Sequence, residues 1–175
     1  MTTYAIDPTH SSISFSVRHM MFAKVRGQFS KWSTDLALDT SDLAKSSVKV
    51  TIDASSIDTG VADRDNHLRS ADFFDVANHP SITFESTSVV KNGGGFSLGG
   101  NLSIHGVTKP VVLELERLGS GKDPWGNDRQ LFSAKTSIQR SDFGLTWNQA
   151  LEAGGVLVSD KIEIEVEVQA VGKPA

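Results

Sequence analysis

Residues 161–169 read KIEIEVEVQ, and this stretch decides the fold class. Ile162, Ile164, Val166 and Val168 alternate with glutamates, so every second side chain is apolar. Successive side chains of a β-strand point to opposite faces, and this period of two indicates a strand with one face on a core and the other in solvent. Strands of parallel sheets are usually apolar throughout, so the pattern favours an antiparallel sheet.

The same alternation recurs along most of the chain. Short polar or glycine-rich turns separate the alternating segments, and the turn at Asn92–Gly95 is an example. Gly27 lies inside one of them, where a glycine predicts a bend or bulge. The fold predicted is an antiparallel meander of about eight strands, and a sheet this long must close or split to protect its edges. A closed eight-stranded barrel is just wide enough to be filled by side chains or to hold one ligand. The predicted strands are Ser12–Arg18, Val25–Leu38, Ser47–Asp53, Ile82–Val90, Phe96–Ile104, Val111–Leu118, Leu131–Gln139 and Lys161–Gln169.

The segment Asp58–Ser86 departs from this alternation. Asp58 or Thr59 is placed to cap a short, mostly polar helix that ends near Ser70. The adjacent Phe73 and Phe74 follow it, and strand-like alternation resumes after a proline. A short helix that buries one thin apolar stripe is therefore expected in this segment.

Composition limits the classes of function. The chain has 175 residues and no cysteine, and no linker-like run divides it, so a single domain over residues 1–175 is expected. Its formal net charge is −4 and its basic residues are scattered, which argues against a nucleic-acid partner. The N-terminal residues lack a basic segment followed by an apolar one, so a cytoplasmic protein is expected.

Familiar catalytic and metal-binding motifs are missing from the sequence. The five histidines show no HxH, HxxxH or HExxH spacing, so no metal site is predicted. There is no GxSxG motif, and the glycine runs at residues 93–95 and 119–121 lie in hairpin turns rather than between a strand and a helix. No cofactor is predicted either.

Two sets of side chains remain as candidates for a binding site. The polar set is Arg64, Asp65 and His67 in the predicted helix, with Arg140 and Asp142 in a second break of the alternation. The arginines and aspartates either pair to tie the helix and the late loop to the barrel, or the set receives a polar head group. The aromatic set either fills a core or lines an apolar cavity along the barrel axis.

Four separated motifs carry a resemblance to a known family. They are YAIDPTHSSISFSVRHMMFAKVRGQFSKW (4–32), SIDTGVADRDNHLRSADFFDVANHPSITFES (56–86), GNLSIHGVTKPVVLELE (100–116) and IQRSDFG (138–144). In this order they resemble the YceI-like family of polyisoprenoid-binding proteins, and the resemblance extends from Tyr4 to about Val171. It implies an all-β fold, an extended, lipocalin-like, eight-stranded antiparallel barrel with a short helix and loop at one end.

The resemblance also implies a function. The barrel interior would be a long hydrophobic tunnel that holds a long-chain isoprenoid lipid, such as an isoprenoid quinone or a polyprenyl phosphate, for storage, transport or sequestration. No catalytic residue is implied. A homodimer and transient contact with a membrane are further expectations.

Position along the matched chain and strand parity assign the expected site residues. The expected tunnel lining is Phe15, Val17, Phe29, Phe84, Leu102, Phe132 and Ile138, with Leu68, Phe73, Phe74 and Phe143 at its mouth. The candidates for a polar head-group site are His19, Arg64, Asp65, His67 and Arg140.

Two alternatives stay open at the level of sequence. In the first, the protein is an enzyme that acts on an amphipathic substrate, with His19 or His67 as the acid or base beside Asp65. In the second, the barrel is filled by its own side chains and the outer surface is an interaction module.

Overall fold

The computed structural model describes residues 2–20, 22–148 and 157–174. Its described residues contain eleven β-strands, one α-helix and four short 3-10 helices. All eleven strands belong to one antiparallel sheet. The strands are β1 (Thr2–Ile6), β2 (Ser12–His19), β3 (Ala23–Phe29), β4 (Trp32–Ala37), β5 (Ser47–Asp53), β6 (Ile57–Asp58), β7 (Ser81–Asn92), β8 (Gly95–Ile104), β9 (Val107–Lys122), β10 (Asp128–Gln139) and β11 (Val158–Pro174).

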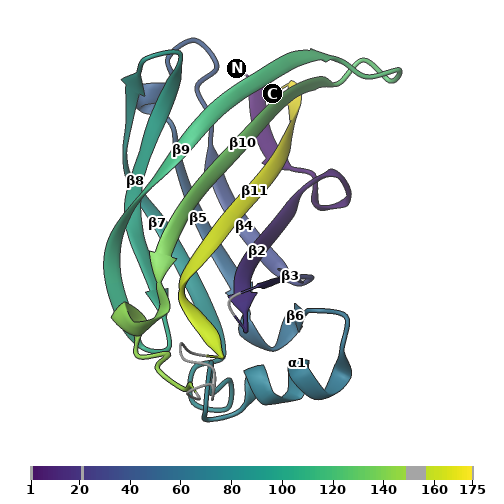
Figure 1. The fold of residues 1–175 in the computed structure, drawn as a ribbon. Helices are drawn as coiled ribbons and strands as arrows, with labels where there is room; N and C mark the ends of the chain where they lie inside the picture. Colours follow the sequence, from purple (N-terminus) through teal and green to yellow (C-terminus); the bar gives the residue numbers. More distant parts are fainter. Residues whose placement is uncertain (1, 21, 149–156, 175) are drawn as a thin grey trace.

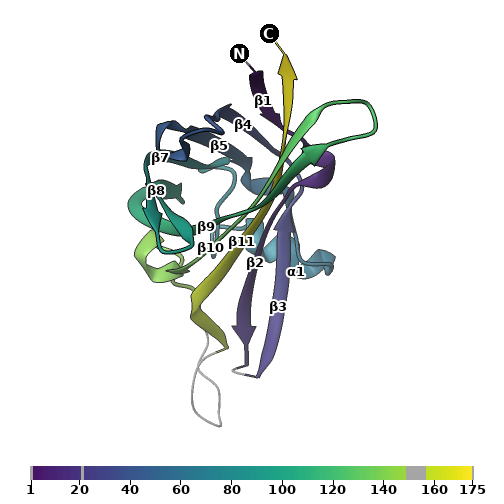
Figure 2. The same cartoon turned by 90° about the horizontal axis from the view of Figure 1, so that it is seen from above.

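The sheet is strongly curled around a central space, as Figures 1 and 2 show. Its strands follow the order β4-β5-β7-β8-β9-β10-β11-β2-β3-β6, and β1 pairs with β11 beside this path. The helix α1 (Ala62–Arg69) lies at one end of the molecule, while both chain termini lie at the other end (Figure 1). The predicted all-β antiparallel class with one short helix is confirmed.

A corner in the chain joins the two ends of this strand order. Only Ser30 and Lys31 separate β3 from β4, although the two strands have different neighbours in the sheet. The Ser30 N–H donates to the Ser56 carbonyl oxygen at 3.2 Å, and the Asp53 N–H donates to the Lys31 carbonyl oxygen at 2.9 Å. Strand β4 pairs with β5, and β3 pairs with β6. The two bonds at the corner link the chain segments that lie between these two strand pairs.

The predicted count of eight strands is therefore wrong. The corner divides the predicted strand 25–38 into β3 and β4, and the short strands β1 and β6 were not predicted. Gly27 is not the bend either, since the register of β2 against β3 is regular where it pairs with Phe15. A Cβ atom at Gly27 would lie 2.4 Å from the Phe15 ring, so this glycine permits the close approach of that ring.

The helix also begins differently from the expectation. Its N-cap is Val61, with no side-chain capping bond, rather than Asp58 or Thr59. Thr59 instead donates to Asp65 in the first turn of the helix, from its backbone N–H at 2.9 Å and from its hydroxyl at 2.5 Å. The α-helix and the 3-10 helices of the described residues are too short or too polar to cross a membrane.

Apolar side chains from nearly every strand meet inside the curl. The buried polar or charged residues of the described chain are Asp65, Gln130 and Arg140. The apolar cluster consists of Phe29, Leu43, Ile52, Ala54, Ile57, Ile82, Phe84, Val89, Leu98, Leu102, Ile104, Leu113, Phe132, Ala134, Phe143 and Leu145.

Candidate functional site: an apolar cavity inside the curled sheet

The curled sheet encloses a cavity of about 300 Å³ whose accessible wall is apolar. Ala170, which pairs with Ile6 of the N-terminal strand β1, lines it at one end, and Leu68 of α1 and the nearby Phe73 line it at the other. The cavity therefore extends along the length of the sheet rather than forming a local pocket. Its volume is at the lower end of the range of about 300–1,000 Å³ that is typical of ligand sites in proteins.

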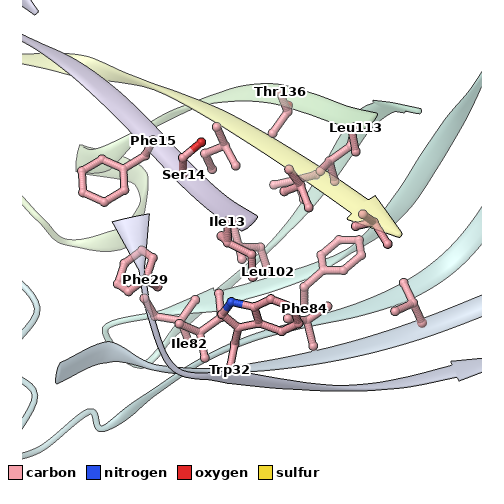
Figure 3. A pocket seen from close by; sticks show the side chains of 18 of the residues that line it. Ile13, Ser14, Phe15, Phe29, Trp32, Ile82, Phe84, Leu102, Leu113 and Thr136 are labelled. Atoms are coloured by element: carbon pink, nitrogen blue, oxygen red, sulfur yellow. The ribbon is translucent and has the colours of Figure 1, made fainter. Parts of the chain in front are cut away.

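The wall follows directly from the alternation in the sequence. Ile162, Ile164 and Val166 of β11 all line the cavity, as their parity predicted. Ile164 pairs with Phe15, and Val166 pairs with Ile13 of β2, so neighbouring strands present apolar side chains at the same level. Figure 3 shows Ile13 and Phe15 from β2 with Phe84, Leu102 and Leu113, which come from three other strands.

Hydroxyl groups near the cavity are bonded to the backbone. The Ser14 hydroxyl donates to the Glu165 carbonyl at 3.1 Å, and the Thr136 hydroxyl donates to the Val112 carbonyl at 2.9 Å. The Ser46 hydroxyl oxygen accepts the Asp39 N–H at 2.9 Å. Because these groups have partners in the protein, serine and threonine can line the cavity without making its wall polar.

Most of the residues expected to line the tunnel lie on this wall. They are Phe15, Val17, Phe29, Leu68, Phe73, Phe74, Phe84, Leu102, Phe132 and Ile138. They come from β2, β3, β7, β8 and β10, and from α1 and the loop that follows it.

Phe143 is the exception among the expected lining residues. It belongs to the 3-10 helix Arg140–Phe143, is 1% exposed, and does not line the cavity. The chain turns at Gly144, which has φ +75°, so Phe143 is packed into the core behind the wall. Parity reasoning failed here because the strand period ends at Gln139.

Several wall residues were not among the site candidates. Most of them have the same inward parity as the candidates, so strand alternation predicts them, but most lie outside the four matched motifs. The main additions are Trp32, Leu36, Val48, Val50, Ile52, Leu98, Val111, Leu113, Ile162, Ile164, Val166 and Val168.

Arg140 is the one head-group candidate that lines the cavity. It is 4% exposed, and its guanidinium donates to four carbonyl oxygens at 2.8–3.2 Å. The acceptors are Leu145 and Trp147 in the following loop, and Val158 and Ser159 at the start of β11. Burial lowers the pKa of Arg140, while the nearby Asp160 carboxylate acts in the opposite direction.

The guanidinium also lies near an aromatic wall residue. The Arg140 Cζ atom is 5.9 Å from the centre of the Phe73 ring, which is within range of a cation–π contact. A positive charge is thus held at the α1 end of the cavity.

Arg64 and Asp65 do not line the cavity. Both bind Thr59: Arg64 donates from Nε to the Thr59 hydroxyl and from Nη2 to the Thr59 carbonyl, both at 2.7 Å, and Asp65 accepts the two bonds described above. They hold the start of the helix against the chain that leaves β6. One interpretation of the sequence expected arginine–aspartate ion pairs that tie the helix and the late loop to the barrel. Among the described residues, none of the ion pairs includes Arg64, Asp65, Arg140 or Asp142.

His67 and His19 also lie off the wall. His67 Nε2 is 2.8 Å from Asp72, and its ring contacts Phe73 and Trp147 edge-on, with centroids 5.0 and 4.7 Å apart. His19 ends β2, where it pairs with Ala23 and Val158. His67 and Asp65 do not form the expected acid–base pair, because residues two apart on a helix do not face each other.

A match to a known family accompanies this architecture. The model of the YceI-like domain family matches residues 4–170. The chain belongs to the YceI-like family. The resemblance carried by the four sequence motifs is thereby confirmed.

Relatives and solved structures agree with this assignment. A UPF0312 protein of Vibrio cholerae is 39% identical over 173 residues, covering 97% of this chain and 87% of that protein. A Campylobacter jejuni YCEI protein superposes with a TM-score of 0.75 at 31% identity, covering 99% of this chain and 100% of the other. A polyisoprenoid binding domain from Saccharophagus degradans has the same fold, with a TM-score of 0.69, 17% identity, and coverage of 99% and 100%.

Proposed function

We propose that this YceI-like protein binds a long-chain isoprenoid lipid in the cavity of its curled sheet. The observation that carries the proposal is the continuous apolar wall, which extends from Leu43 and Ala170 to Leu68 and Phe73. The polyisoprenoid-binding domain from Saccharophagus degradans, which shares the fold, supports the same class of ligand. Transfer of apolar surface out of water stabilises a complex by about 25 cal/mol per Å², so an isoprenoid chain can bind here without a catalytic group.

The position of Arg140 suggests how the ligand is oriented. Its buried guanidinium lies at the α1 end of the wall, where it favours an electron-rich head group such as a quinone carbonyl or a phosphate. The isoprenoid chain would then extend along the sheet toward the end with the chain termini. Binding alone suffices for storage, sequestration or transport, and a homodimer and brief contact with a membrane are part of the same proposal.

An enzymatic function has less support. The expected partner of a catalytic histidine, Asp65, is bonded to Thr59, and His67 is bonded to Asp72 instead. We therefore assign a binding role.

A matched pair of substitutions tests this function. Val111 lines the cavity, whereas the adjacent Val112 is 60% exposed on the outer face. Val111→Trp fills the cavity and should abolish uptake of an isoprenoid quinone by solvent-stripped protein, while Val112→Trp should leave it unchanged. Uptake is measured by organic extraction and mass spectrometry of the reisolated protein, with circular dichroism as a check of folding.

The contrary result is equally clear. If stripped wild-type protein takes up neither a quinone nor a polyprenyl phosphate, the protein does not bind this class of lipid. If both tryptophan variants take up the lipid as well as wild type does, the cavity is not the binding site. Val166→Phe, which fills the cavity from β11, is a second variant in case Val111→Trp does not fold.

A further inference from the structure

Three potential metal ligands converge outside the cavity. Asp75, His79 and His105 each offer one ligand atom, and these three atoms all lie within 4.8 Å of one another. The residues are half-buried, so they are fixed by their surroundings and still partly accessible. Among the described residues, this is the one group of three or more histidine and carboxylate side chains with such spacing.

The local backbone brings Asp75 and His79 together. They lie four residues apart in the loop after α1, and the His79 N–H donates to the Asp75 carbonyl oxygen at 2.9 Å, which closes a tight turn between them. The turn keeps the two residues close together. The Asn78 side chain donates to Asp75 Oδ2 at 2.9 Å and so orients the carboxylate.

His105 comes from a different part of the chain. It occupies the tight turn between β8 and β9, and its ring meets the His79 ring with centroids 4.8 Å apart. A Cβ atom at Gly106 would lie 2.8 Å from the His79 ring, so the glycine beside His105 makes this approach possible. The turn at residues 75–79 and the turn at His105 and Gly106 thus bring the two imidazole rings together.

The backbone conformation of the group is unusual. Asp75 has φ +48° and His105 has φ +55°, and Met20 is the other described non-glycine residue with positive φ. Glycine or asparagine is the usual residue at such positions in a tight turn. Residues held in this region of φ/ψ space often cluster at functional sites.

We propose that Asp75, His79 and His105 bind one divalent transition-metal ion. Imidazole nitrogen and carboxylate oxygen suit Zn²⁺ and its neighbours, whereas Mg²⁺ and Ca²⁺ prefer oxygen ligands alone. In a tetrahedral Zn²⁺ site, bonds of about 2.0–2.2 Å place the ligand atoms ~3.4 Å apart. Metal binding would therefore require side-chain rotations that bring the three ligand atoms closer than their present spacing of up to 4.8 Å. Three protein ligands leave a fourth position for water or another ligand.

The ion would connect two parts of the cavity wall. Phe73 and Phe74 shortly precede Asp75, Ile104 directly precedes His105, and all three line the cavity. A bound ion would fasten the loop after α1 to the turn between β8 and β9. The metal site does not depend on the identity of the lipid.

Metal binding by the purified protein tests the proposal. Metal-free wild-type protein is titrated with Zn²⁺ by calorimetry and with Co²⁺ by visible absorption, and one ion per chain with the intense bands of four-coordinate Co²⁺ is expected. Asp75→Asn, His79→Gln and His105→Asn should each weaken Zn²⁺ binding by more than ~10-fold. Asparagine tolerates positive φ, so the variants at residues 75 and 105 keep the backbone conformation.

A second histidine–carboxylate pair serves as the matched control. His10 and Asp7 are 2.9 Å apart in the segment between β1 and β2, and His10→Gln should bind Zn²⁺ as wild type does. If the wild-type protein binds no ion, or if the three variants bind it with unchanged affinity, the proposal is wrong. Where a variant does not fold, NMR shifts of the His79 and His105 ring nitrogens in wild type on addition of Zn²⁺ decide, because a ligand nitrogen must shift.

Discussion

At the level of single residues, Arg140 makes four hydrogen bonds to backbone carbonyls beside the cavity. Its four bonds join the loop at Leu145 and Trp147 to the start of β11. None of the ion pairs in the described chain involves it, so its buried charge is compensated by four backbone carbonyls and by the field of the nearby Asp160 carboxylate. Arg140 thus has a structural role in addition to any contact with a ligand. The sequence motif alone did not distinguish between these two roles.

Replacement of Arg140 should reveal this structural role. Arg140→Met removes all four bonds and should lower the free energy of unfolding by about 2–4 kcal/mol, because hydrogen bonds to a charged group are stronger than neutral ones. Arg140→Lys should recover part of the loss, since it retains the charge but has fewer, less directed donors. Urea denaturation measures both, with the exposed Arg18→Met as a control that changes stability by less than ~0.5 kcal/mol. A Met variant as stable as wild type would refute the role.

At the scale of elements, α1 is held by polar bonds rather than by an apolar face. Leu68 is its contribution to the cavity wall, and the rest of the helix is mostly polar. Arg64, Asp65 and Arg69 instead bond to chain segments before the helix, at Thr59 and at the carbonyls of Ser55 and Ile57. An isolated helix of eight residues is not stable in water, so these bonds and the tertiary contacts keep it folded.

Loss of the Asp65 carboxylate should loosen this helix. Asp65→Ala leaves the Thr59 N–H and hydroxyl without their acceptor, and we expect it to cost about 1–3 kcal/mol and to speed amide hydrogen exchange across residues 59–69. Asp63 lies exposed in the same turn, so Asp63→Ala controls for the charge near the helix N-terminus. Equal exchange rates in the two variants would contradict the assigned role of Asp65.

Strand prediction succeeded and failed for identifiable reasons. The inward parity of β2, β5 and β11 was predictable because it follows from the alternation of side chains along each strand. The corner at Ser30–Lys31 was not, because it depends on bonds to Asp53 and Ser56. The predicted helix cap was also wrong, since Thr59 donates to the Asp65 side chain rather than accepting from the first free N–H groups of the helix.

At the level of the whole molecule, we expect the free energy of unfolding to depend on whether the cavity holds a lipid. A ligand that binds only the folded state stabilises it by RT ln(1 + [L]/Kd), about 2.7 kcal/mol at one hundred times Kd. Protein stripped of lipid by organic solvent and refolded should therefore melt at a lower temperature than protein reloaded with an isoprenoid quinone. Differential scanning calorimetry measures the shift. The Val111→Trp variant should show no such shift on loading, and an equal shift in that variant would place the lipid elsewhere.

The sequence by itself determined the all-β class, the family, and which face of most strands is apolar. These properties depend on residues close together in the chain or on motifs that can be compared directly. Only the tertiary structure decided that the apolar faces leave one continuous cavity, that Arg140 binds four carbonyls at its edge, and that His79 and His105 meet. Each of these depends on contacts between segments that are separate in the chain, and local alternation carries no information about such distances.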